Sequence, residues 1–236
     1  MNDDLLGRLH RLTPRTWVTP AIVAINLAAW LATLLAGADA LNPSGAQLLA
    51  LGGNRLAETR EEPWRLLSAT ILHAGLPHLA LNMWALWDTG RVAERFYGNL
   101  QFLLLYVLSG LGGSLTSLFF AGKAAVSVGA SGAIFGVVGA LLAAIWVRPG
   151  SLPAPLIRPL LTSLLISAGV SLLLGLTAGG VDNAAHLGGL ATGLLLAAIM
   201  DGRAGWTFAR GRALLRLACA VLLAALAGST AWRWLA

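Results

Sequence analysis

Residues 128–147 read VGASGAIFGVVGALLAAIWV, twenty residues without a charged side chain. A helix needs about 20 mostly apolar residues to cross the hydrocarbon core of a bilayer, so this run predicts a membrane-spanning helix. Further runs of this kind lie at residues 17–37, 77–96, 100–121, 156–176, 183–200 and 213–235. The run 77–96 is the least apolar, because four charged residues (Asp88, Arg91, Glu94 and Arg95) fall in its last third. The sequence therefore predicts an all-α fold, a polytopic transmembrane helical bundle.

The composition predicts the same class of protein. Hydrophobic residues make up 57% of the 236 residues, charged residues make up 11%, and the mean hydropathy is +0.76. An ordinary soluble domain carries roughly 25% charged residues, so these values exclude a disordered chain, a coiled coil and a typical soluble enzyme. The net charge of +6 comes from bases scattered between the apolar runs, which indicates a role in topology and not in nucleic-acid binding. A single cysteine, Cys219, excludes a disulfide or thiolate metal site within one chain.

The lysines and arginines between the runs predict the orientation. With the amino terminus in the cytoplasm, eleven of these bases fall in inner segments and five in outer ones, as is typical of membrane proteins. Seven spans then place the carboxy terminus outside, together with the connection 38–76, which shows no obvious structure of its own and is expected to be functional. The first run also resembles a cleaved signal peptide, but about 20 apolar residues are long for a signal, and more spans follow it.

Several polar residues fall at one depth in the predicted bundle. Spans two, four and six share one direction, from outside to inside, because alternate spans of a membrane protein run the same way. His78 and Asn82, Ser131, and His186 lie in the first turns of these three spans. Polar and ionisable groups are costly inside a membrane and are functional candidates there. The sequence therefore predicts that these four side chains converge below the outer surface.

Small residues recur every four positions in two of these spans. They are Gly132 and Gly136 in span four, and Ala185, Gly189 and Gly193 in span six. Such stripes let two helix backbones approach closely, and ordinary helix packing is one explanation for them. If the two stripes face each other, the serine and the histidine at their outer ends come within reach.

A serine becomes a nucleophile when an adjacent base takes its proton. His186 is the histidine on the helix expected to contact Ser131, so the two residues predict a Ser–His dyad. Asp182 lies one turn before His186 on the same helix, and Glu94 lies at the opposite membrane face. Neither acid is placed to complete a triad.

Acyl transfer also needs hydrogen-bond donors aimed at the developing oxyanion. His78 and Asn82 are one helical turn apart and project from one helix face. With the backbone N–H of Ser131 they predict an oxyanion hole, and Gly129 lets the chain approach it without a side chain. A rival prediction is a metal site formed by three histidines (His73, His78 and His186), which lacks a carboxylate or cysteine at suitable spacing.

Four motifs, in this order along nearly the whole chain, resemble the rhomboid family of intramembrane serine proteases. They are Trp64-Arg65, His73-x4-His78-x3-Asn82, Gly129-x-Ser131-Gly132, and Ala185-His186-x2-Gly189-x3-Gly193. The resemblance implies a Ser131/His186 dyad and cleavage of transmembrane protein substrates, with oxyanion donors from His78, Asn82 and the Ser131 amide. It implies no cofactor and no metal. It also implies a rhomboid-like six-helix core with a C-terminal seventh helix, the six-plus-one layout.

The same resemblance divides the chain and assigns further residues. Residues 1–16 are expected as a short cytoplasmic segment, 17–204 as the catalytic core with the outer loop 38–76, and 205–236 as a linker with the additional transmembrane helix. Supporting roles around the active site fall to Gly129, Gly132, Phe135 and Gly189, and structural roles to Trp64, Arg65, His73, Glu94 and Arg95. Phe135 stands where many relatives have a tyrosine stacked beneath the histidine, so a ring without the hydroxyl is expected. The glycines of residues 179–181 are expected to form a flexible cap.

The expected setting is a bacterial inner membrane, with the active site open to the outer side and with lipid and transmembrane proteins, but no nucleic acid, as partners. One alternative is a catalytically inactive rhomboid-like protein that escorts membrane proteins. A second is a rhomboid variant that trims C-terminal sorting tails. A transporter would be expected to carry ionisable groups or broken helices near the midplane, and the sequence shows neither clearly.

Overall fold

The computed structural model describes residues 13–121, 125–147 and 182–200, and the single positions 7, 10, 11, 158, 161, 162, 166 and 169. The predicted span 213–235, the segment 205–236 and the expected cap at residues 179–181 lie outside the described residues. Most of the predicted span 156–176 lies outside them as well.

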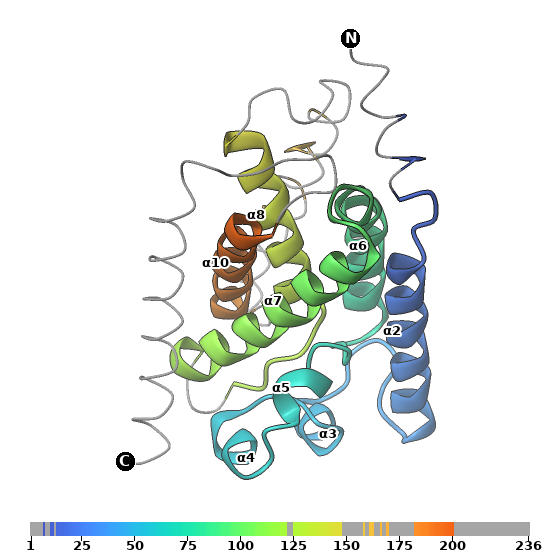
Figure 1. Cartoon of the computed structure of the whole chain (residues 1–236). Helices are drawn as coiled ribbons and strands as arrows, with labels where there is room; N and C mark the ends of the chain where they lie inside the picture. The colour runs from blue at the N-terminus through green and yellow to red at the C-terminus, as the bar shows by residue number, and fades with distance from the viewer. Residues whose placement is uncertain are drawn as a thin grey trace.

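Regular structure in the described ranges is helical, as the sequence predicted (Figure 1). The long helices are α2 (Val18–Leu35), α6 (Leu76–Tyr97), α7 (Asn99–Phe120), α8 (Ser131–Val147) and α10 (Asn183–Ile199), and each coincides with a predicted span. The short helices α3 (Gly45–Ala50), α4 (Leu56–Glu61) and α5 (Arg65–Ser68) lie between α2 and α6. The all-α prediction is confirmed for this part of the chain.

The described helices differ in length and in apolar character, the two properties that a membrane-spanning helix requires. Among the described residues, α2 and α7 are long and apolar enough to cross one. Helices α8 and α10 are apolar but have 17 residues each. Helix α6 has 22 residues, and its last third carries the charged side chains that made the run 77–96 the least apolar.

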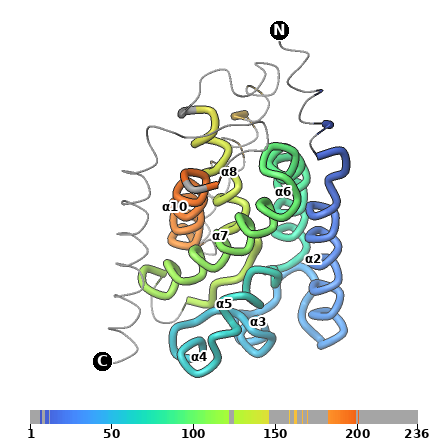
Figure 2. Tube along the Cα trace, viewed as in Figure 1, coloured from blue at the N-terminus to red at the C-terminus, as the bar shows by residue number. Residues whose placement is uncertain are grey.

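The long helices pack around one core (Figures 1 and 2). Helix α7 crosses the pair formed by α8 and α10, and α2 packs beside α6. Gly132 and Gly136 of α8 face Gly189 and Gly193 of α10 in the same order along both helices, so α8 and α10 are parallel. This is the shared direction that the alternation of spans predicted for them.

A single glycine joins α6 directly to α7. Gly98 lies between the two helices with a φ of 81°, a conformation that favours glycine because it has no Cβ. The sharp turn brings the buried residues Phe96, Tyr97 and Phe102 into the core. The Tyr97 hydroxyl donates to the carbonyl of Ala140 at 2.9 Å, which satisfies a polar atom in this apolar interior and ties α6 to α8.

The outer connection 38–76 contains structure that the sequence prediction missed. Helix α3 begins with a capping box, in which the Ser44 hydroxyl accepts from the N–H of Gln47 and the Gln47 side chain accepts from the N–H of Ser44. In α4, Arg55 pairs with Glu58, and this contact lowers the pKa of Glu58 to about 2. The three short helices have four to six residues, too few for an apolar period to appear in the sequence.

At the opposite end of the bundle, Glu94 ties α6 to α2. Its fully buried carboxylate accepts from the N–H of Val18 at 2.8 Å, the N–H of Thr19 at 2.9 Å and the Thr19 hydroxyl at 2.7 Å. These backbone donors belong to the first turn of α2, which has no partners for them within the helix. Beside it, the Arg95 guanidinium donates to the carbonyl of Thr13 at 3.2 Å. Glu94 therefore joins α6 to α2, and Arg95 joins α6 to the segment that precedes α2.

Candidate active site

Ser131 and His186 form a hydrogen bond across two helices. Ser131 is the first residue of α8 and His186 lies in the first turn of α10. The Ser131 Oγ and the His186 Nε2 are 2.8 Å apart, and His186 is 3% exposed. This is the distance and pairing that proton transfer from a serine to a base requires.

The close approach of α8 and α10 is what brings these two side chains together. A Cβ built on Gly189 would lie 1.9 Å from the carbonyl oxygen of Gly132, and one on Gly193 would lie 1.8 Å from that of Gly136. No side chain fits in either place, so the two backbones touch directly. The two stripes of small residues face each other, and the serine and histidine at their outer ends meet as expected.

Phe135 lies one helical turn after Ser131 and holds the histidine from one side. Its ring stacks on the His186 imidazole with centroids 4.3 Å apart and planes 6° apart. The contact restricts rotation of the imidazole while leaving its Nε2 directed at Ser131. The structure thus places the aromatic ring where the sequence expected it.

His78 lies on the other side of the serine, against Gly129. A Cβ on Gly129 would meet the His78 Cε1 at 2.7 Å, its Nε2 at 3.0 Å and the Ser131 Oγ at 3.7 Å, and the φ of Gly129 is 127°. The Nδ1 of His78 accepts from the N–H of Ala74 at 3.3 Å. A neutral imidazole carries one N–H, so this contact favours the tautomer with the proton on Nε2, the nitrogen that lies beside Gly129.

The two other donors that the sequence predicted for an oxyanion hole are Asn82 and the Ser131 amide. The Asn82 amide nitrogen donates to the carbonyl of His78 at 2.9 Å, and because an amide nitrogen carries two N–H groups, one more remains. The N–H of Ser131 belongs to the first turn of α8, where backbone donors have no acceptor inside the helix. His78, Asn82 and the Ser131 amide therefore each keep an N–H group that an oxyanion hole would need.

The segment before Ser131 is anchored to the outer loop through Asn54, a residue that the sequence analysis missed. Asn54 and Ser127 exchange two backbone hydrogen bonds at 3.0 and 2.8 Å, and the buried Asn54 Oδ1 accepts from Thr59 at 2.8 Å. The N–H of Gly129 then donates to the carbonyl of Ala69 at 2.8 Å. A buried asparagine in a glycine-rich loop is a weak sequence signal, because its partners are distant in the chain.

Arg65 organises the outer loop from within. Its guanidinium donates to the carbonyls of Leu49 at 2.6 Å and Gly53 at 3.2 Å, and to the Glu62 carboxylate at 2.7 Å. It also lies 4.9 Å from the centroid of the Trp64 ring. Arg65 is buried and Trp64 is exposed, so this pair joins parts of the loop and does not reach the dyad.

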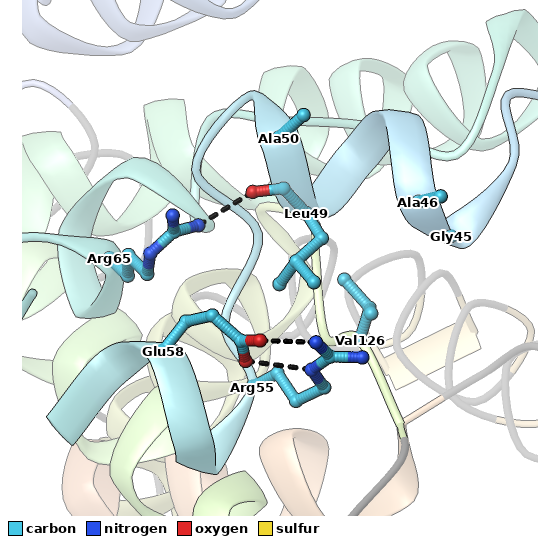
Figure 3. Close-up of a pocket in the computed structure, with 8 residues that line it drawn as sticks. All are labelled: Gly45, Ala46, Leu49, Ala50, Arg55, Glu58, Arg65 and Val126. Atoms are coloured by element: carbon cyan, nitrogen blue, oxygen red, sulfur yellow. Dashed lines mark hydrogen bonds and ion pairs between the residues drawn. The ribbon is translucent and has the colours of Figure 1, made fainter. Parts of the chain in front are cut away.

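A cavity lies in the outer loop beside Arg65 (Figure 3). It is lined by Gly45, Ala46, Leu49, Ala50, Arg55, Glu58, Arg65 and Val126. Its charged side chains already have partners, since Arg55 pairs with Glu58 and Arg65 donates to Leu49. Neither Ser131 nor His186 lines this cavity.

His73 contacts the site only through a neighbour. Its buried ring meets the His78 ring edge to face, with centroids 5.2 Å apart and planes 63° apart. Within the described ranges, no three histidine, cysteine or acidic residues form a group able to hold a metal ion. His73, His78 and His186 therefore do not make the ligand set of the rival metal site.

Comparisons with known proteins agree with these motifs. Residues 60–203 match the family model of the Rhomboid domain. The chain is 41% identical over 167 residues to rhomboid protease GluP of Bacillus subtilis strain 168, covering 70% of this chain and 31% of that protein's length. It is 33% identical over 238 residues to mitochondrial RHOMBOID-like protein 6 of Arabidopsis thaliana, covering 85% of this chain and 75% of the relative. With rhomboid protease AarA of Providencia stuartii the identity is 31% over 203 residues, covering 76% and 70%.

Proposed function

Because the chain belongs to the rhomboid family of intramembrane proteases and is an integral membrane protein, we propose that it is a serine endopeptidase. It cleaves peptide bonds in or near the transmembrane segments of other membrane proteins. The observation that carries this proposal is the 2.8 Å contact between the Ser131 Oγ and the His186 Nε2. In it, Ser131 is the nucleophile and His186 is the general base.

The first half of the reaction acylates the serine. The Ser131 Oγ attacks the scissile carbonyl carbon while its proton passes to the His186 Nε2. The tetrahedral intermediate collapses, the C–N bond breaks, and His186 returns the proton to the leaving amine. Phe135 keeps the imidazole plane fixed during both transfers, since the two rings are nearly parallel.

The oxyanion is stabilised by the three donors around Ser131. They are the His78 Nε2–H, the Asn82 amide and the backbone N–H of Ser131, and each such donor contributes about 3–4 kcal/mol to the transition state. The hydrogen bond from Ala74 to the His78 Nδ1 supports this role, because it keeps the proton on the nitrogen beside Gly129.

The second half of the reaction hydrolyses the acyl-enzyme. A water molecule gives a proton to the His186 Nε2 and attacks the ester carbon, and the Ser131 Oγ leaves and regains its proton from His186. Water must therefore reach a serine below the membrane surface. We expect a polar opening to the outer side at the starts of α8 and α10.

Substrates follow from the same geometry. A peptide bond inside a stable helix is poorly presented to a nucleophile, so the substrate segment unwinds locally around the scissile bond. Glycine or proline near that bond favours unwinding, and small residues at the bond itself fit the closely packed surroundings of Gly129 and Gly132.

The membrane layout is part of the proposal. The chain forms a six-helix core with an additional C-terminal helix in a bacterial inner membrane, with its amino terminus in the cytoplasm and its carboxy terminus outside. The distribution of lysine and arginine supports this orientation. Residues 17–204 form the catalytic core.

The test is cleavage of a labelled single-span substrate by the purified chain in detergent or liposomes. Wild type is expected to give defined fragments, and Ser131→Ala and His186→Ala are expected to give none above background. His10→Ala and Ser117→Ala remove the same side chain types elsewhere and are expected to retain cleavage. Fragments that are identical in all five proteins would refute the proposal.

A second measurement does not depend on which protein substrate is chosen. A fluorophosphonate probe that labels activated serines is expected to modify Ser131 in wild type and to fail in His186→Ala. A chain that neither cleaves nor labels while folded would indicate an inactive, substrate-binding relative. Cleavage confined to C-terminal tails of exported proteins would identify the tail-trimming variant.

A further inference from the structure

Three buried polar atoms gather at the start of α10. They are the His186 Nδ1, the Asp182 Oδ2 and the Asn183 Oδ1, and none of them has a hydrogen-bond partner within the described part of the chain. Buried polar atoms of this kind are nearly always satisfied by protein or by bound water. Their occurrence together, beside the dyad, calls for a common explanation.

The His186 Nδ1 needs an acceptor in the proposed mechanism. Because the Nε2 takes the Ser131 proton, the neutral ring carries its own proton on Nδ1. Asp182 is the N-cap residue of α10, four residues before His186, and its carbonyl accepts from the N–H of His186 at 3.2 Å. The two side chains are close enough to interact electrostatically, although no direct hydrogen bond joins them.

Asp182 caps α10 with only one of its two carboxylate oxygens. The Oδ1 accepts from the N–H of Ala185 at 3.0 Å and caps α10. Asparagine and serine cap helices as well as aspartate does. The cap therefore explains one oxygen, and the buried Oδ2 and its charge are left for another role.

We propose that Asp182 is a positioning residue for His186, acting through one bridging water. The water accepts from the His186 Nδ1–H and donates to the Asp182 Oδ2, and Asn183 supplies a further acceptor for it. The carboxylate fixes the tautomer and orientation of the imidazole and stabilises the imidazolium formed when Ser131 loses its proton. Asp182 takes no proton itself, so the catalytic pair remains a dyad. This inference rests on the proposed function and deepens it.

Substitutions at Asp182 separate the cap from the charge. Asp182→Asn and Asp182→Ser keep a capping acceptor and remove the carboxylate, whereas Asp182→Ala removes both. Asp39→Asn is the matched control, because that carboxylate also binds backbone N–H groups in the outer region but lies in an exposed turn. Cleavage of the labelled substrate gives kcat and KM, and thermal unfolding of the full chain in detergent gives stability.

We expect Asp182→Asn and Asp182→Ser to lower kcat by about 10- to 100-fold, because a hydrogen bond to a charged group is lost, with KM and the unfolding midpoint unchanged. Asp39→Asn retains the wild-type kcat. If both capping variants cleave like wild type while Asp182→Ala loses activity together with stability, Asp182 is a helix cap only and the inference is wrong.

A spectroscopic readout distinguishes failure of this inference from failure of the proposed function. The chain has four histidines, so ¹⁵N-histidine labelling gives few ring signals, and His186→Ala assigns the one of interest. Asp182→Asn is expected to shift the His186 Nδ1 signal in the resting protein, whether or not a substrate is cleaved. An unchanged signal overturns the inference even if wild type is an active protease, whereas absent cleavage with a shifted signal refutes only the protease.

Discussion

The ring of Phe135 lies flat on the imidazole of His186, with centroids 4.3 Å and planes 6° apart. Both side chains are buried, and the His186 Nε2 contacts Ser131 on the edge of the same ring. The proposed base, His186, therefore packs against an aromatic ring. Phenylalanine provides this surface without a hydroxyl group.

Replacing Phe135 tests the stacking. We expect Phe135→Leu to lower kcat/KM by about 2- to 10-fold, because an aromatic pair contributes about 0.5–1.5 kcal/mol. Phe135→Tyr keeps the ring and is expected to stay within about twofold of wild type. Steady-state cleavage of the labelled substrate measures both, and a Phe135→Leu protein as active as wild type would show that stacking is dispensable.

Asn82 tests the oxyanion hole. We expect Asn82→Ala to lower kcat by about 100-fold with KM nearly unchanged, since an oxyanion donor acts in the transition state and not on the bound substrate. The matched control is Asn42→Ala, which removes an exposed asparagine from the outer loop. A raised KM with an unchanged kcat for Asn82→Ala would assign the residue to substrate binding instead.

Gly189 tests the contact between α8 and α10. A Cβ at this position would lie 1.9 Å from the Gly132 carbonyl oxygen, so we expect Gly189→Ala to lower the free energy of unfolding by about 1–3 kcal/mol and to abolish cleavage. Gly45→Ala is the control, because its Cβ would meet nothing closer than 3.9 Å. Unfolding in detergent measures both variants, and equal stability would contradict the close backbone contact.

Glu94 tests the link between α6 and α2. Glu94→Gln replaces a buried carboxylate oxygen by an amide nitrogen that cannot accept from Val18 or Thr19. Leaving a buried donor without a partner costs about 1–3 kcal/mol, so a lower unfolding midpoint is expected. Glu61→Gln changes an exposed glutamate and is expected to leave the midpoint unchanged. An unchanged unfolding midpoint for Glu94→Gln would contradict a stabilising role for these hydrogen bonds.

The ion pair in α4 makes a pH-dependent contribution to stability. The hydrogen bond from Arg55 lowers the pKa of Glu58 from 4.5 to about 2. A lowered pKa means that the pair stabilises the folded loop fully above pH 4.5 and loses this effect as the pH falls toward 2. We therefore expect the difference in unfolding midpoint between wild type and Glu58→Gln to shrink as the pH falls from about 6 to about 3, because Glu58 becomes protonated in the unfolded chain below pH 4.5 and the folded-state pair then gives a smaller advantage. A constant difference would show that Glu58 acts without its charge.

The parts of the fold that are local or set by composition could be predicted from the sequence. Long apolar runs predicted the five long helices, because backbone groups inside a membrane must pair within the helix. Spacing by four predicted that Gly132 and Gly189 lie in a helix contact. The short helices of the loop 38–76 could not be predicted, since a six-residue helix such as α3 is held by caps and neighbours and not by an apolar period.

The candidate site shows the same division. The sequence placed Ser131, His78 and His186 at one depth, because the alternation of spans follows from counting them. It did not predict Asn54, whose backbone pairs with Ser127 across the outer loop. It also left Asp182 outside the site, because spacing along one helix does not reveal which polar atoms lack a partner.

The sequence by itself determined the class of protein, and it predicted the shared direction of α8 and α10 and the residues of the candidate site. These properties depend on composition and on helical periodicity, which are local. Only the tertiary structure decided that the Ser131 Oγ meets the His186 Nε2 at 2.8 Å and that the His78 ring lies against Gly129 while its Nδ1 accepts from Ala74. Both depend on contacts between distant segments, where a few tenths of an ångström in helix packing separate a hydrogen bond from none.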